Sequence, residues 1–223
     1  VLYYLNRKAM KKSIIMIMGG TASHDMSVDP EYRKCAKGYK RIYVETQSMK
    51  AEMDAAGFEN VDIYPNGRFR PQKAVELKTA DKKLRCVFFS QVQPEKGADL
   101  VLEAARMLPH VDFSFYGDIV DDYKDIFMSR VNAQQNVSYY GVFKGSIDAV
   151  YGELSKYDVL LFPTKWDIEG VPGILVEGKI TGLAEIVSNK SYNAELVQDG
   201  VEGVVIAENT GNCLAAAIQQ LAE

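Results

Sequence analysis

The 223-residue sequence is poor in cysteine and histidine and has a single tryptophan. Its three cysteines are far apart and form no CxxC pair, so neither a zinc site nor a disulfide framework is expected. No apolar run approaches the ~20 residues of a membrane-spanning helix, and no signal-peptide pattern occurs. No Gly-x-Gly-x-x-Gly follows an expected strand, which argues against a Rossmann dehydrogenase. We therefore expect a cytoplasmic protein with no zinc site and no organic cofactor.

Charge is distributed unevenly along the chain. Residues 1–85 contain 17 Lys and Arg against 10 Asp and Glu, whereas residues 86–223 contain 9 against 20. The strongly acidic C-terminal part argues against nucleic-acid binding. The basic N-terminal part suits peripheral contact with an anionic lipid surface at the inner face of a membrane. The alternative is that its basic residues form only solvated helix surfaces.

After residue 85, short apolar stretches alternate regularly with helical patterns. Stretches such as "VLLF" are apolar throughout, as expected of strands that are buried on both faces. This alternation predicts an α/β fold with a Rossmann-like parallel sheet and helices on both faces. The six expected strands are "CVFFS", "DFSFYG", "VSYYG", "DVLLFP", "EIVS" and "GVVIA".

The first 70 residues predict part of a second α/β domain. Strands are expected at residues 13–18, 41–46 and 60–67, with a helix at 48–57 that Ser48 caps and Gly57 ends. Residues 21–40 are polar and rich in turn formers. The predicted domains are a partial N-terminal, acceptor-side domain at 1–70, a linker at 71–85 and a ligand-binding domain at 86–223. Because strand–helix–strand units are few before residue 70 and the chain begins without Met, we expect the first domain to be incomplete.

Several polar or glycine-containing turns follow the expected strands of the larger domain. Lys96 follows the first strand, and Gly117 follows the second. The turn at 141–143, which contains Phe143, follows the third strand. Glu169 follows the fourth strand. In open parallel sheets, ligands bind beyond the carboxyl ends of the strands. These residues are therefore expected on one rim.

The stretch after the fourth strand suits a phosphate group. A helix is expected to begin near Val171, because Pro172 lacks the N–H that would be unbonded at the first helical position. Gly170 and Gly173 would let backbone approach a ligand closely. The free N–H groups at the start of such a helix favour an anion, and Lys96 could add a positive charge.

Two glutamates flank this helix start. Glu169 precedes it, and Glu177 lies about one turn inside it. Each carboxylate could accept hydrogen bonds from vicinal hydroxyls, so the rim is suited to a diphosphate that carries sugars at both ends. The alternatives are that Glu169 only complements the helix dipole and that Glu177 is only solvated.

In this order, the stretches resemble the C-terminal half of a family 4 (group 1) retaining glycosyltransferase of the GT-B fold. The resemblance covers about residues 86–210, and an upstream segment resembles the end of the family's N-terminal domain with its Pro-Asn-Gly turn. The stretches that carry it are "FFSQVQPEKGADLVLEAARML", "FSFYGD", "NVSYYGVF", "YDVLLFPTKWDIEGVPGILVEGKITGL", "NAELVQDGVEGVVI" and, upstream, "RIYVETQSMKAEMDAAGFENVDIYPNGRF".

The resemblance implies transfer of a sugar from a UDP- or GDP-linked donor, with retention and without a metal ion. It assigns Glu169 and Lys96 catalytic roles, on the donor-sugar hydroxyls and on the diphosphate. It assigns Glu177 to the ribose and places the turn with Phe143 near the base. The acceptor would be a saccharide or a lipid-linked molecule, in the synthesis of a bacterial polysaccharide or glycolipid.

Two departures from the family pattern leave other readings open. Gln91 stands where the family commonly has an arginine, so stabilisation of the diphosphate would be weaker or come from elsewhere. The family's histidine at the end of an N-domain strand is absent from residues 18–20, and we read His24 as a polar loop residue. Trp166 is expected either to border the sugar pocket or to pack within its loop. A non-catalytic nucleotide-sugar-binding relative or partner subunit, or an epimerase, therefore remains an alternative, and an incomplete chain would bind donor but turn it over poorly.

Overall fold

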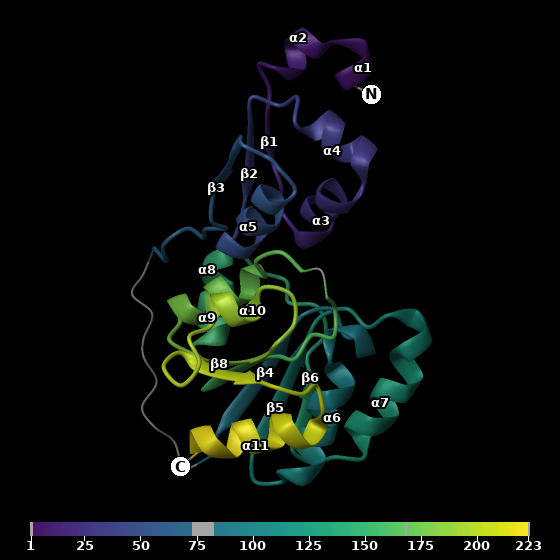
Figure 1. Cartoon of the computed structure of the whole chain (residues 1–223). Coiled ribbons are helices and arrows are strands. Elements are labelled where there is room, and N and C mark those ends of the chain that lie inside the picture. The colour runs from purple at the N-terminus through teal and green to yellow at the C-terminus, as the bar shows by residue number, and fades with distance from the viewer. Residues whose placement is uncertain (1, 73–82, 168, 223) are drawn as a thin grey trace. The chain divides into compact units, whose positions relative to one another are not determined.

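The computed structural model describes residues 2–72, 83–167 and 169–222 (Figure 1). The chain forms two compact units. The N-terminal unit consists of Val1–Gly67 with Asp167–Pro172, and the C-terminal unit of Arg68–Trp166 with Gly173–Glu223. Most of the linker predicted at 71–85, namely residues 73–82, lies outside the described residues.

The N-terminal unit contains a three-stranded parallel sheet in the order β1-β2-β3. Its strands are β1 (Ile14–Met16), β2 (Arg41–Val44) and β3 (Val61–Ile63). Its helices are α1 (Leu2–Leu5), α2 (Arg7–Met10), α3 (Gly20–Val28), α4 (Pro30–Ala36) and α5 (Gln47–Ala55). Residues 21–40, which the sequence predicted as polar turns, thus contain most of α3 and all of α4, and that prediction was wrong.

Local capping explains these helix boundaries. The Asp29 carboxylate accepts the backbone N–H groups of Glu31 and Tyr32, and Pro30 occupies the first turn of α4. The Thr46 hydroxyl accepts the N–H of Met49, so α5 is capped by Thr46 rather than by the predicted Ser48. A carboxylate or hydroxyl at the N-cap replaces a hydrogen bond that the first helical turn lacks.

The C-terminal unit contains a six-stranded parallel sheet in the order β6-β5-β4-β7-β8-β9. All six strands coincide with predicted stretches. They are β4 (Arg85–Phe89), β5 (Asp112–Tyr116), β6 (Val137–Tyr139), β7 (Val159–Phe162), β8 (Ala184–Ser188) and β9 (Gly203–Ile206). The helices are α6 (Ala98–Met107), α7 (Lys124–Asn132), α8 (Ile147–Leu154), α9 (Gly173–Ile180), α10 (Asn193–Leu196) and α11 (Gly211–Ala222).

Helices cover both faces of this sheet, with α6, α7 and α11 on one face and α8, α9 and α10 on the other (Figure 1). Alternate residues of each strand pack against the helices on opposite faces of the sheet. Cys86 and Phe88 of β4 belong to the larger apolar cluster with α6, α7 and α11, whereas Val87 belongs to the cluster with α8 and α9. The apolar strands are therefore explained by burial on both faces.

The strand order reverses between β4 and β7, which are neighbours in the sheet although β5 and β6 lie between them in sequence. In doubly wound sheets, the crevice at such a reversal is the usual place for a ligand. The predicted rim lies at the carboxyl ends of these strands. None of the described helices is long and apolar enough to cross a membrane.

Candidate functional site

The loop that follows β4 carries Lys96 at the end of a 3-10 turn (Pro94–Lys96). The next residue, Gly97, has φ +83°, and a Cβ there would lie 2.2 Å from the carbonyl oxygen of Pro163. The N–H of Lys165 donates to the carbonyl of Glu95 at 2.8 Å. Backbone contact therefore joins the loops that follow β4 and β7, and only glycine fits at position 97.

The Lys96 ammonium lies 4.0 Å from the centroid of the Trp166 ring. This is a cation–π distance, and it holds the ammonium at the rim. Trp166 is 45% exposed, so it is not packed inside its loop. Of the two readings that the sequence left open, packing within the loop is disfavoured.

The loops after β4, β5 and β6 are also bonded to each other. The N–H of Gly117 donates to the carbonyl of Gly141 at 2.9 Å, and a Cβ at Gly117 would lie 1.8 Å from the carbonyl oxygen of Ser90. Gln91 follows Ser90, and its side-chain oxygen accepts from the Gln93 amide at 3.2 Å. The close approach of Ser90, which follows β4, therefore requires glycine at position 117, whether or not Gly117 also contacts a ligand.

Phe143 packs on aromatic side chains of the sheet. Its ring centroid lies 5.7 Å from that of Phe89 and 6.1 Å from that of Tyr116. These ring contacts pack the turn after β6 against the ends of β4 and β5. The predicted proximity of this turn to a base stays a prediction.

Glu177 on α9 forms an ion pair with Arg68. The two groups meet through Arg68 Nε and Glu177 Oε1 at 2.7 Å, and the side chains are 26% and 12% exposed. The guanidinium also fills the space beside Gly173, where a Cβ would lie 1.4 Å from Arg68 Nη2. Gly173 therefore does bring backbone close to a polar group, but in this structure that group is Arg68.

Tyr151 on α8 anchors the segment that carries Arg68. Its hydroxyl donates to the carbonyl of Phe69 at 2.7 Å. Burial, and then the negative charge of Glu177, raise the pKa of Tyr151, while Arg68 opposes this effect. The phenol therefore stays a hydrogen-bond donor and keeps residues 68–69 on α8 and α9.

The segment at 167–172 belongs to the N-terminal unit, and α9 begins at Gly173 rather than near Val171. The N–H of Val171 donates to Glu45 Oε2 at 3.0 Å. A Cβ at Gly170 would lie 2.3 Å from the same carboxylate oxygen and 2.5 Å from the Cα of Gly19. The Val171 amide is therefore occupied by Glu45, which would have to release it before a phosphate could bind there.

The C-terminal unit holds Lys96, Gln91, Gly117, Phe143, Gly173 and Glu177, whereas Glu169, Gly170 and Val171 group with the N-terminal unit. The pairing of Glu169 with Glu177 in one site therefore stays a prediction. Among the described residues, no group of three His, Cys, Asp or Glu side chains is arranged to hold a metal ion. Sequence reasoning missed Arg68 and Glu45, because a basic residue in a polar stretch and an acid after a strand have no specific pattern.

Comparison with known proteins identifies the family of this chain. The model of the family "Glycosyl transferases group 1" matches residues 83–223, which is more than half of the chain. The chain belongs to this family. The match extends from β4 to α11, so it contains the whole six-stranded sheet of this group 1 glycosyltransferase chain.

A curated relative of this group 1 chain is the amylovoran biosynthesis glycosyltransferase AmsK of Erwinia amylovora. It is 27% identical over 178 residues, which are 74% of this chain and 42% of AmsK. Among solved structures, Anabaena HepE in complex with UDP and glucose matches with a TM-score of 0.74 and 17% identity over 95% of this chain and 62% of HepE. TarM of S. aureus, in a complex that contains UDP, matches with a TM-score of 0.69 and 18% identity over 95% of this chain and 44% of TarM. The structural matches show the GT-B fold, and the chain spans less than two thirds of each of these relatives.

Proposed function

We propose that this chain is the donor-binding part of a retaining family 4 glycosyltransferase. It would move a sugar from a UDP- or GDP-linked donor to a saccharide or lipid-linked acceptor, without a metal ion, in polysaccharide or glycolipid synthesis. The observation that carries the proposal is the set of mutually bonded loops at the carboxyl ends of the strands, which bears Lys96 and Gly117 and precedes the helix with Glu177. AmsK, named for amylovoran biosynthesis, and HepE, solved with UDP and glucose, support the same chemistry.

In the proposed reaction, the bond between the anomeric carbon and the diphosphate oxygen breaks, and its electron pair passes to the leaving diphosphate. The acceptor hydroxyl oxygen bonds to the anomeric carbon, and its proton passes to the leaving diphosphate. Lys96 would move from the Trp166 ring to this developing charge, and such electrostatic stabilisation is usually the largest catalytic contribution. Gln91 offers hydrogen bonds but no charge. Glu169 would accept hydrogen bonds from the donor sugar, and Glu177 from the ribose.

In the proposed arrangement, residues 86–223 bind the donor and residues 1–70 form the acceptor side. A non-catalytic relative would bind the same donor without turnover. Gln91 is the specific feature that favours this second candidate, because it leaves Lys96 as the one cation assigned to the diphosphate. The product's anomeric configuration, read by NMR after incubation with a bound nucleotide-sugar, distinguishes retention, inversion and absence of transfer.

A calorimetric titration of the wild type with UDP, GDP and uridine tests the proposal. At least one of the two nucleoside diphosphates should bind. The Lys96→Ala variant should bind that diphosphate about 10-fold more weakly, because a charge-assisted contact contributes roughly 1.5 kcal/mol or more. If UDP is the ligand, uridine affinity should not change. Lys124→Ala, on α7, is the matched control, and a wild type that binds neither diphosphate would refute the proposal.

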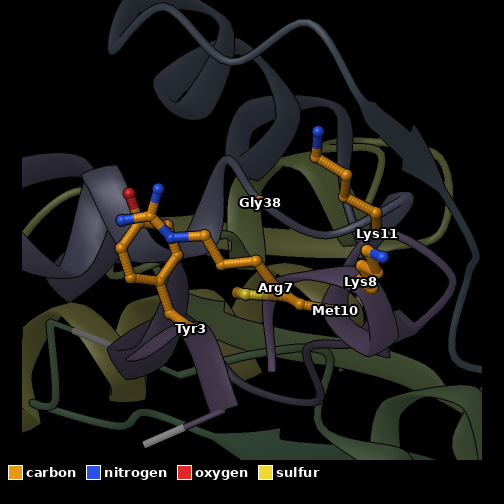
Figure 2. A pocket seen from close by; sticks show the side chains of 6 residues that line it. All are labelled: Tyr3, Arg7, Lys8, Met10, Lys11 and Gly38. Carbon is orange, nitrogen blue, oxygen red and sulfur yellow. The ribbon is translucent and has the colours of Figure 1, made fainter. Parts of the chain in front are cut away.

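We also propose that the N-terminal unit contacts an anionic lipid surface. A cavity of about 250 Å³ there is lined by Arg7, Lys8 and Lys11 (Figure 2), with Arg7 lying 4.5 Å from the centroid of the Tyr3 ring. Among the described residues, no carboxylate forms an ion pair with these three cations. Each basic residue near an anionic surface contributes about 1 kcal/mol of binding.

Co-sedimentation with phosphatidylglycerol vesicles checks this contact. Reversing two charges, with Lys8→Glu and Lys11→Glu together, should weaken the partition coefficient by at least about 30-fold. The control reverses two exposed charges of the C-terminal unit, Arg106→Glu and Lys124→Glu, and should have a smaller effect. Equal losses in both variants, or equal binding to uncharged phosphatidylcholine vesicles, would rule out a specific contact.

A further inference from the structure

A cavity of about 460 Å³ opens on one face of the six-stranded sheet, over β5 and the edge strand β6 and beside α8. Its volume lies within the range of small-molecule sites. Its lining is mainly polar, although parallel strands normally present apolar side chains to both faces. The residues that matter here are Ser114, Tyr116, Ser138, Tyr140, Glu153 and Lys156.

The polar lining is confined to this face of β5 and β6. On the opposite face, Phe113 and Phe115 of β5 are buried in the larger apolar cluster. Ser114 and Tyr116, which alternate with them, are only 8% and 6% exposed. Ser138, Tyr140 and Lys156 are exposed, so the cavity is open to solvent beside the buried Ser114 and Tyr116.

The hydroxyl of Tyr116 is fixed in place. It donates to Glu153 Oε1 at 2.7 Å and lies 3.0 Å from the hydroxyl of Tyr157. Burial alone would raise the pKa of Glu153, but the hydrogen bonds from Lys156 and Tyr116 outweigh burial and lower it. The carboxylate therefore stays charged and oriented, so little order needs to be imposed when a ligand binds.

The charged residues of the cavity are already compensated within the C-terminal unit. Each lies within 4.0 Å of an opposite charge, so a charged ligand would have to compete with an existing ion pair. The pairs are Lys156–Glu153 at 2.7 Å, Lys83–Asp112 at 2.5 Å and Arg85–Asp158 at 3.9 Å. The lining therefore favours a neutral ligand whose polar groups donate and accept many hydrogen bonds.

Tyr140 supplies a flat apolar surface beside these polar groups. It is 58% exposed, and its ring stacks on Tyr116 with centroids 5.0 Å apart and an angle of 14°. Tyr116 in turn stacks on Phe89 at 5.0 Å. The stack holds the Tyr140 ring rigidly with one face accessible, and such a ring supplies contact area at low entropic cost. A pyranose has the complementary shape, with C–H groups on its faces and hydroxyls around its edge.

We propose that this cavity binds a short neutral oligosaccharide on the face of the sheet, beside the donor rim. Arg85 and Asp112, at the amino ends of β4 and β5, also line it, so it extends away from the carboxyl ends where the donor is expected. The site would hold part of a saccharide chain while transfer takes place elsewhere. Binding there requires no nucleotide, so the inference stands or falls independently of the donor site.

Saturation-transfer NMR with maltotriose and cellotriose as neutral probes, and trigalacturonic acid as a charged one, tests the site. We expect millimolar binding of a neutral probe, at least about 10-fold weaker binding of the acid, and a loss of about 10-fold in the Tyr140→Ala variant. Ser138→Ala, which removes only a hydroxyl, should lose less. Tyr32→Ala, on α4 of the other unit, should bind as the wild type does.

UDP titration of the same proteins separates the two sites. Tyr140→Ala should retain wild-type affinity for UDP if the wild type binds it. Absence of binding by both neutral probes at about 10 mM, or equal binding by the wild type and Tyr140→Ala, would overturn the inference. Oligosaccharide binding that persists where binding of both UDP and GDP fails would refute the donor proposal alone.

Discussion

Replacing Glu177 with alanine is expected to weaken the binding of the nucleoside diphosphate by about 100-fold, or about 2.7 kcal/mol. Hydrogen bonds to a charged carboxylate contribute about 1.5–3 kcal/mol each, and vicinal ribose hydroxyls would make two of them. Glu177→Gln should lose about 10-fold, because the amide retains one acceptor without the charge. Asp125→Ala, which removes an exposed carboxylate from α7, should leave the affinity unchanged.

A nucleotide without ribose hydroxyls shows whether Glu177 acts there. The wild type should bind 2′,3′-dideoxy-UDP as weakly as Glu177→Ala binds UDP, and the variant should not distinguish the two ligands. If the wild type and Glu177→Ala prefer UDP over 2′,3′-dideoxy-UDP by the same factor, Glu177 does not contact the ribose. Thermal unfolding of each variant confirms that the comparison is made between folded proteins.

Arg68 should act through Glu177, since its Nε holds one carboxylate oxygen at 2.7 Å. Arg68→Ala should therefore weaken binding by roughly 5-fold in the wild type and have no further effect in Glu177→Ala. Residues that contact each other typically show such coupling in a double-mutant cycle. Additive losses would instead indicate that Arg68 contacts the nucleotide directly.

The alternation of apolar stretches and helical patterns was sufficient to predict the C-terminal sheet. Stretches such as "VLLF" have one physical solution, a strand buried on both faces, and β7 has all four residues buried. The family resemblance added the GT-B fold, which the structural matches confirm. The rim followed from topology, because carboxyl ends of parallel strands lie at the same edge of a sheet.

Contacts between segments distant in sequence could not be predicted. Arg68 and Glu177 are 109 positions apart, and Glu45 and Val171 are 126 apart, so no local pattern links them. Helix α3 was missed because it has neither a clear apolar stripe nor a side-chain cap. Helix α9 begins at Gly173, two residues after the predicted start, and residues 167–172 before it group with the N-terminal unit.

The second large expected effect is a pH dependence of stability that Glu185 causes. It lies on β8 and is fully buried, and among the described residues neither of its carboxylate oxygens has a hydrogen-bond partner. A Cβ at Gly178 would lie 2.6 Å from Glu185 Oε1, so α9 packs directly on the carboxyl group. Burial raises the pKa of Glu185 to about 8, although the nearby Lys179 opposes the shift.

The sign of the pH effect follows from this raised pKa. Between about pH 4.5 and pH 8 the folded protein retains a proton on Glu185 that the unfolded chain releases. The stabilisation that protonated Glu185 contributes to the folded protein is therefore fully present below about pH 4.5. It is lost as the pH rises to about 8. One pKa unit corresponds to 1.36 kcal/mol, so the free energy of unfolding should fall by on the order of 4 kcal/mol across this range.

The Glu185→Met variant should remove that dependence, because methionine is similar in length, has no charge and fills irregular space. At pH 8 it should be more stable than the wild type by on the order of 4 kcal/mol, whereas near pH 4.5 the two should differ little. Urea unfolding followed by the fluorescence of Trp166, the single tryptophan, reports on the C-terminal unit. Asp125→Asn should follow the wild-type profile at every pH, and parallel profiles for Glu185→Met and the wild type between pH 5 and 8 would show that the buried carboxyl group does not control stability.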